Sequence, residues 1–154
     1  LIGHSERREY LKENNVLLLN KLERASENKL KVIFCVGESL SDFKNKKRKQ
    51  RLKIQLSNIF SEKVDLDTLI VAYEPVWAIG KNITPNINEI DEIHSFIKEF
   101  MKKQYNVDDI PVLYGGSVNA KNSRGIFSLK NVNGGLIGGA SLIASEFCKI
   151  YDTL

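Results

Sequence analysis

The stretch TLIVAYEPVWAIG, residues 68–80, is an apolar run that ends at an acidic residue and a proline. A continuous apolar run is typical of a parallel strand covered on both faces, and Pro75 ends the strand because it cannot donate a ladder hydrogen bond. Glu74 is therefore predicted to lie at the carboxyl end of a buried strand. In sheets of alternating strands and helices, ligands bind and catalytic side chains project at that end.

Short apolar segments alternate with amphipathic segments along the rest of the chain, which predicts an α/β protein with a parallel sheet. No linker or domain boundary is evident. The predicted strands span residues 30–36, 68–73, 110–114 and 132–137. The predicted helices are 11–29, a helix from Ser41-Asp42 with Leu52, Leu56, Ile59 and Phe60 on one face, a helix with Ile90, Ile93, Ile97, Phe100 and Met101 on one face, 120–128 and 140–151.

The composition is that of an ordinary globular domain, with 154 residues of which 42% are hydrophobic and 27% charged. No apolar run approaches the length of a membrane span, and the N-terminus lacks a signal-peptide pattern. Cys35 and Cys148 lack metal-ligand spacing and are predicted to be buried thiols, which favours a cytoplasmic location.

Two further groups of residues are given structural roles. The basic run from Lys44 to Lys53 is interpreted as the exposed face of a helix, because apolar residues follow at helical spacing without interleaved aromatic residues. His94 is interpreted as a surface or packing histidine. We therefore expect neither a nucleic-acid partner nor a membrane partner.

Two consecutive predicted strands end in glycine pairs, Gly115-Gly116 before Ser117 and Gly138-Gly139 before Ala140. Glycine lets the backbone approach a ligand closely, and a helix that begins directly afterwards presents unpaired N–H groups. These loops are a candidate phosphate site, like the one after the last two strands of a (β/α)₈ barrel. The alternative is that the glycines only permit tight turns.

His4 is the second catalytic candidate, since it precedes a predicted helix start. The positive end of the helix dipole disfavours the imidazolium form, and a neutral ring can donate a hydrogen bond to a substrate oxygen. A purely structural histidine, and an ion pair of Glu6 with Arg7 or Arg8, are the open alternatives.

Five motifs carry a resemblance to a known family: IGHSERR at 2–8, CVGE at 35–38, YEPVWAIG at 73–80, YGGSV at 114–118 and GGASL at 138–142. In order and spacing, they resemble the loop motifs of the triosephosphate isomerase family. The resemblance implies α/β architecture as a partial (β/α)₈ TIM barrel, from the end of strand 4 to strand 8 with their helices. It also implies interconversion of dihydroxyacetone phosphate and glyceraldehyde 3-phosphate in glycolysis and gluconeogenesis, without cofactor or metal.

The resemblance assigns roles to individual residues. Glu74 matches the general base and His4 matches the electrophile. Glu6 resembles a family carboxylate that supports these catalytic residues. The family is a standard example of a glutamate base with a neutral histidine, and these roles are assigned here from the resemblance alone. The residues that match phosphate contacts are Gly80, Ser117, Gly138 and Gly139. The residues that resemble the first hinge of a mobile loop are Pro75, Val76 and Trp77.

The chain departs from the family pattern in two places. Residues 81–85 read KNITP where the family commonly shows Thr-Gly-Lys-Thr-Ala, and Pro85 and Ile83 are stiff residues at this second hinge. The family's first-strand Asn and Lys and its dimerisation loop have no counterpart, and Lys81 is not expected to replace that Lys.

The chain begins at Leu1, and only part of the roughly 250 residues of such a barrel is present. We therefore expect residues 1–154 to be one incomplete barrel domain, inactive alone, from a protein that is a homodimer at full length. The alternative is a non-catalytic phosphate-binding or scaffold remnant.

Overall fold

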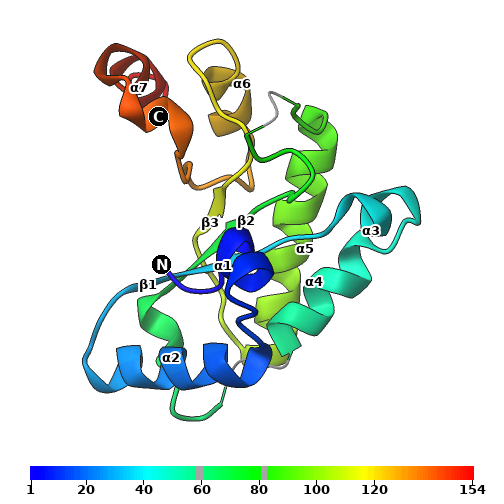
Figure 1. Ribbon diagram of the computed structural model, residues 1–154, viewed down its shortest axis with the longest axis vertical. Helices are drawn as coiled ribbons and strands as arrows, with labels where there is room; N and C mark the ends of the chain where they lie inside the picture. Colours follow the sequence, from blue (N-terminus) through cyan, green and yellow to red (C-terminus); the bar gives the residue numbers. More distant parts are fainter. Residues whose placement is uncertain (58–60, 81–82) are drawn as a thin grey trace.

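A parallel sheet lies at the centre of the structure, a computed structural model that describes residues 1–57, 61–80 and 83–154. Among these residues, the sheet contains three strands in the order in which they occur along the chain (Figure 1). The strands are β1 (Val32–Val36), β2 (Leu69–Tyr73) and β3 (Val112–Tyr114). Because Val36, Tyr73 and Tyr114 lie opposite one another, the three strands end at the same edge.

Helices connect the strands, which confirms the predicted α/β class. Their bounds are α1 (Ser5–Tyr10), α2 (Asn15–Glu27), α3 (Leu40–Lys44), α4 (Arg48–Ser57), α5 (Ile87–Tyr105), α6 (Ser123–Phe127) and α7 (Ala144–Tyr151), with 3₁₀ turns η1 (Leu66–Thr68) and η2 (Gly139–Leu142). Side chains cap several starts: Asn14 caps α2, while Ser39 with Asp42 and Asn86 with Glu89 form capping boxes on α3 and α5.

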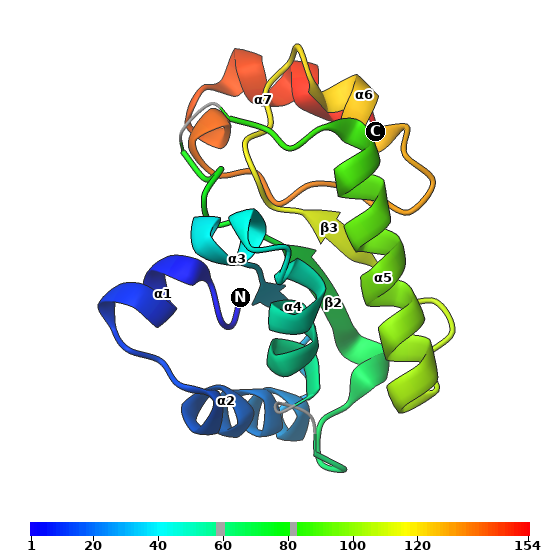
Figure 2. The ribbon, with the colours of Figure 1, turned by 90° about the vertical axis from the view of Figure 1, so that its right-hand side faces the viewer.

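The core lies between the sheet and the helices that pack against it. Helix α4 packs on β1, α5 packs on β3, and α4 and α5 contact each other (Figure 2). Leu52 and Leu56 of α4 and Ile90, Ile93 and Ile97 of α5 are buried, as their helical spacing predicted. Helices α6 and α7 lie at the opposite end of the molecule from α2 (Figures 1 and 2).

The predicted single helix from Ser41 is wrong, because the structure divides it into α3 and α4. Lys46 has φ 56°, in the left-handed region, and so it cannot continue α3. The like charges of residues 44–49 also disfavour a continuous helix. Ile59 and Phe60 lie outside the described residues.

The predicted strand at 132–137 forms only an isolated parallel bridge between Tyr114 and Gly135. The Val112 N–H donates to the side-chain oxygen of Asn133 at 3.0 Å, in place of a backbone carbonyl. Gly134 has φ 141°, outside the range of extended strands. The Asn133 side-chain hydrogen bond and the Gly134 backbone conformation therefore interrupt the hydrogen-bond ladder between β3 and the predicted strand.

Two helix predictions at the ends of the chain need correction. The helix predicted from Leu11 begins at Asn15, because Asn14 caps it and Lys12 has φ 54°. Cys148 is exposed rather than buried, since α7 buries only Ile150. Cys35 is buried, as predicted. Within the described residues, no helix combines the length and apolar composition needed to cross a bilayer.

His94 lies fully buried on α5, which confirms a packing role. Its ring forms a T-shaped pair with the Tyr73 ring at a centroid distance of 5.8 Å, and the centroid of the Tyr114 ring lies 6.2 Å away. Burial lowers the pKa of His94 to about 4, because the interior disfavours the charged form.

Acid should destabilise the protein through His94. Between pH 6.5 and the folded-state pKa of about 4, the unfolded chain binds a proton that the folded chain does not, so stability falls as the pH falls. We expect His94→Phe to remove about 2 kcal/mol of the loss between pH 7 and pH 5. Urea titrations of both proteins at each pH measure this difference, and parallel pH dependences would contradict it.

Candidate functional site

Glu74 is the first residue after β2, and it is only 2% exposed. Its Oε1 lies 3.1 Å from His4 Nε2, and its Oε2 accepts the Ser5 N–H at 3.1 Å. Burial raises the pKa of Glu74, and the opposing effects of His4, the Ser5 N–H, the Cys35 thiol and Arg8 offset this only in part. The site therefore holds a carboxylate that is a stronger base than an ordinary glutamate.

Two glycines allow the neighbouring strand ends to close around Glu74. A Cβ on Gly37, directly after β1, would lie 1.7 Å from the Glu74 carbonyl oxygen. A Cβ on Gly115, directly after β3, would lie 2.9 Å from Glu74 Cγ. Any side chain at Gly37 would displace the backbone, so glycine is needed there for close approach. Sequence reasoning did not identify Gly37 as part of the site.

His4 is the N-cap of α1, as the sequence predicted. Its Nδ1 accepts the Glu6 N–H at 3.3 Å, which requires a lone pair on Nδ1. In the neutral ring the proton is therefore on Nε2, which points to Glu74. The structure brings His4 and Glu74 together although 69 residues separate Ser5 from Glu74.

Glu6 contributes to this arrangement through its backbone. Its side chain is exposed, and among the described residues its carboxylate makes no hydrogen bond. The alternative ion pair with Arg7 or Arg8 does not form: Arg7 pairs with Glu13, while Arg8 donates to the carbonyl oxygens of Gly3 and Cys35.

Cys35 lies in β1 with its thiol against Glu74. Burial raises the pKa of Cys35, and the negative charge of Glu74 adds to this effect, so the thiol stays protonated. In turn, the thiol lowers the pKa of Glu74. The sequence indicated a buried thiol, but it gave no sign of the contact with Glu74.

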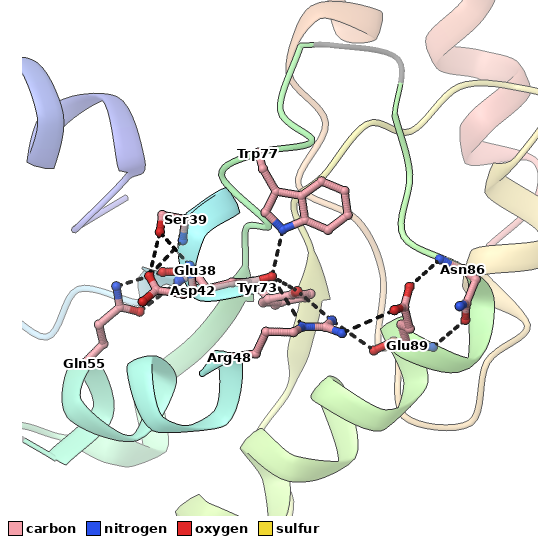
Figure 3. A network of polar contacts seen from close by, with 10 residues as sticks. Glu38, Ser39, Asp42, Arg48, Gln55, Tyr73, Trp77, Asn86 and Glu89 are labelled. Carbon is pink, nitrogen blue, oxygen red and sulfur yellow. Dashed lines mark hydrogen bonds and ion pairs between the residues drawn. The ribbon is translucent and has the colours of Figure 1, made fainter. Parts of the chain in front are cut away.

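The three residues predicted as a hinge leave β2 beside a second buried carboxylate, Glu38. The Val76 N–H donates to the Glu38 carbonyl oxygen at 3.2 Å. The Trp77 indole N–H donates to Glu38 Oε1 at 2.9 Å, as Figure 3 shows. Pro75 accepts the Ala78 N–H at 2.8 Å. Sequence reasoning did not assign Glu38 to the site, although an acidic residue after a buried strand is the same signal that identified Glu74.

The predicted phosphate residues fall into two groups. The Ser117 hydroxyl donates to the Ala78 carbonyl at 2.7 Å, which ties its loop to the turn that ends at Gly80. Gly138 and Gly139 are exposed, and a Cβ on either would meet nothing within 4 Å. Among the described residues, no hydrogen bond joins these two glycines to Ser117. Lys81 lies outside the described residues.

A cavity of about 290 Å³ opens beside Glu74, with Ser5, Arg8, Gly37 and Val76 in its wall. In the part of the chain that the structure describes, no group of three or more His, Cys, Asp or Glu side chains is placed to hold a metal ion.

The His4 tautomer can be tested directly. We expect ¹⁵N NMR of the imidazole to show a protonated Nε2 and an unprotonated Nδ1, because the Glu6 N–H occupies the Nδ1 lone pair. A His4→Gln variant assigns the signals, since His94 is the other histidine of this sequence. A protonated Nδ1 at neutral pH would contradict the observed geometry.

Comparison with known proteins gives consistent matches along the chain. Residues 1–154 match the family model described as triosephosphate isomerase. A triosephosphate isomerase from Thermodesulfovibrio yellowstonii is 41% identical over 152 residues, covering 97% of this chain and 62% of that protein. A triosephosphate isomerase from Francisella tularensis subsp. holarctica is 43% identical over 157 residues, covering 99% of this chain and 62% of that protein.

A solved structure gives the same result. The crystal structure of triosephosphate isomerase from Bartonella henselae superposes with a TM-score of 0.88 at 36% identity, covering 99% of this chain and 62% of that chain. This confirms the expected partial (β/α)₈ barrel. The chain spans about 62% of the length of these relatives.

Proposed function

The chain belongs to the triosephosphate isomerase family, and we propose that the protein containing it interconverts dihydroxyacetone phosphate and D-glyceraldehyde 3-phosphate. The observation that carries the proposal is the buried pair at the carboxyl end of β2. Glu74 is 2% exposed, and its Oε1 lies 3.1 Å from His4 Nε2. A base and a hydrogen-bond donor in contact suit proton transfer next to a carbonyl group.

In the proposed reaction, Glu74 moves a proton between adjacent substrate carbons through an enediolate. Its raised pKa makes it a better proton acceptor than an exposed glutamate. The Nε2–H of His4 polarises the substrate oxygens and stabilises the charge that develops on them. To act, both groups exchange their present contact with each other for contacts with substrate.

We assign phosphate binding to Gly80, Ser117, Gly138 and Gly139. The unobstructed backbone at Gly138 and Gly139 supports this role, because neither positive φ nor packing requires glycine at either position. We also assign the hinge of a closing loop to Pro75, Val76 and Trp77. Closure would exclude water, which strengthens electrostatic interactions and suppresses phosphate loss from the intermediate.

The wider proposal is a glycolytic and gluconeogenic enzyme of the cytoplasm that forms a homodimer and needs no cofactor. We propose that residues 1–154 form one incomplete domain that is inactive alone, with neither nucleic-acid nor membrane partners. The apolar side chains exposed near both ends support the proposal of an incomplete domain, since exposed apolar surface usually packs against further protein. They include Leu1, Tyr10, Leu11, Val16, Leu142, Ile143, Phe147 and Tyr151.

Glu74 should be indispensable as a positioned base. In the protein extended to the length of its relatives, Glu74→Asp retracts the carboxylate by one methylene, and we expect turnover to fall about 100-fold or more. The control is Glu92→Gln, which changes an exposed carboxylate of α5 and should keep full turnover. A coupled isomerase assay measures both. Equal turnover of Glu74→Asp would exclude this role, and an inactive wild type would indicate the non-catalytic remnant.

The Cys35 thiol should tune the pH profile of the same enzyme. The thiol lowers the pKa of Glu74 against the larger effect of burial, so Cys35→Ala should raise that pKa. We expect the acid limb of kcat/KM to move to higher pH, because the charged form of Glu74 loses the stabilising effect of the thiol. An unchanged acid limb would show that the thiol does not affect the base.

A further inference from the structure

Arg48 is the first residue of α4 and belongs to a strongly basic segment, yet it lies among groups from β2, α3, α5 and the loop after β1. Its side chain is only 12% exposed, whereas the lysines on either side of it, Lys47 and Lys49, are exposed. The guanidinium Nε lies 3.4 Å from Glu38 Oε1, and Nη2 donates to the Tyr73 hydroxyl at 3.1 Å (Figure 3). This pattern is not that of a solvated surface charge.

Arg48 contacts Glu38, which is the anchor of Trp77 because it accepts the indole N–H. Glu38 is fully buried, and its Oε1 accepts the Tyr73 hydroxyl at 3.0 Å and the Trp77 indole N–H at 2.9 Å. Burial raises the pKa of Glu38, while the Trp77 hydrogen bond, the positive charge of Arg48 and the Tyr73 hydroxyl oppose this rise. A buried carboxylate without a cation would bind a proton more readily.

Phe43 adds a second connection between Arg48 and Trp77. The centroids of the Trp77 and Phe43 rings are 4.5 Å apart, and the Arg48 guanidinium lies over the Phe43 ring, 5.2 Å from its centroid. The indole is therefore held by its N–H and by its ring, and Arg48 contacts the partner in both cases.

Arg48 also reaches the start of α5 through Glu89. Glu89 Oε2 accepts the Asn86 N–H at 3.0 Å as part of the capping box. The other oxygen, Oε1, lies 3.7 Å from Arg48 Nη1, and the Glu89 carbonyl accepts from Nη2 at 3.5 Å. One guanidinium thus contacts the anchor of Trp77 near the end of β2 and the cap of α5.

We propose that Arg48 is a positioning residue that fixes both ends of the segment between β2 and α5, through Glu38 and Trp77 at one end and Glu89 at the other. The inference deepens the proposed isomerase, because this segment begins at Glu74. Its structural part does not depend on activity. It predicts that loss of the guanidinium changes the environment of Trp77 and the ionisation of Glu38.

The test uses 5-fluorotryptophan labelling and ¹⁹F NMR of the extended protein, with Trp77→Phe to assign the resonance. Arg48→Met should shift the Trp77 resonance and move its pH-titration midpoint to higher pH, because Glu38 loses its cation. Tyr73 and Tyr114 also face Glu38, but burial raises the pKa of each, so they stay protonated in the acid range. Lys49→Ala, which breaks an exposed pair with Glu92 in the same helix contact, should leave the spectrum unchanged.

Conservative variants separate charge from geometry. Arg48→Lys keeps the charge but lacks the planar fork, so the midpoint should stay near that of wild type while the resonance shifts. Glu89→Gln can retain the cap but loses the ion pair, and should shift the resonance without moving the midpoint. These two variants also decide the question if Arg48→Met does not fold, and unaltered spectra from both would overturn the inference.

Kinetics of the same variants give a second readout. Arg48→Met should lower kcat about tenfold and change KM with it, as displaced positioning groups do. Lys49→Ala should change neither. An inactive wild type would overturn the proposed isomerase and leave the Trp77 spectra to decide this inference. Unchanged Trp77 resonance and midpoint in folded Arg48→Met would overturn the inference itself, whatever its turnover.

Discussion

Burial of the Glu74 carboxylate is the constraint on which the candidate site depends. A carboxylate that is 2% exposed loses most of its hydration, so the fold must supply compensating partners. They come from the N-terminus of α1, through His4 and the Ser5 N–H, and from the thiol of Cys35 in β1. These partners leave the carboxylate with a raised pKa, which suits a base. The site is therefore a product of parallel register, since only aligned strand ends bring these groups together.

The neighbouring strand ends in a second buried carboxylate with different partners. Glu38 follows β1 and accepts from Tyr73 and Trp77, with the Arg48 guanidinium beside it. Glu74 instead faces a histidine and a backbone N–H, and a cavity opens next to it. Two buried carboxylates that follow neighbouring strands thus have different surroundings, and these surroundings determine how each carboxylate ionises.

The C-terminal helix α7 differs in burial from helices α4 and α5 in the middle of the chain. Leu52, Leu56 and the apolar face of α5 are buried against the sheet, whereas the apolar residues of α7 other than Ile150 are partly or largely exposed. Apolar residues at helical spacing form a buried face in α5, which packs on β3, α4 and α6. They form a largely exposed face in α7, which among the described residues packs mainly on η2. The exposed Cys148 has this cause, and its predicted burial assumed a partner for α7.

The sequence by itself determined the local features. Apolar runs ending in Gly, Pro or Glu placed β1, β2 and β3, apolar spacing placed α5, and the residue order put Glu74 after a strand and His4 before a helix. The division at Lys46, the interrupted pairing at Asn133 and the contacts of Glu38, Cys35 and Arg48 were decided only by the tertiary structure. The physical reason is that strand and helix preferences depend on neighbours a few residues away. The partner of a buried polar group is set by strand register and helix packing, and it can lie dozens of residues distant along the chain.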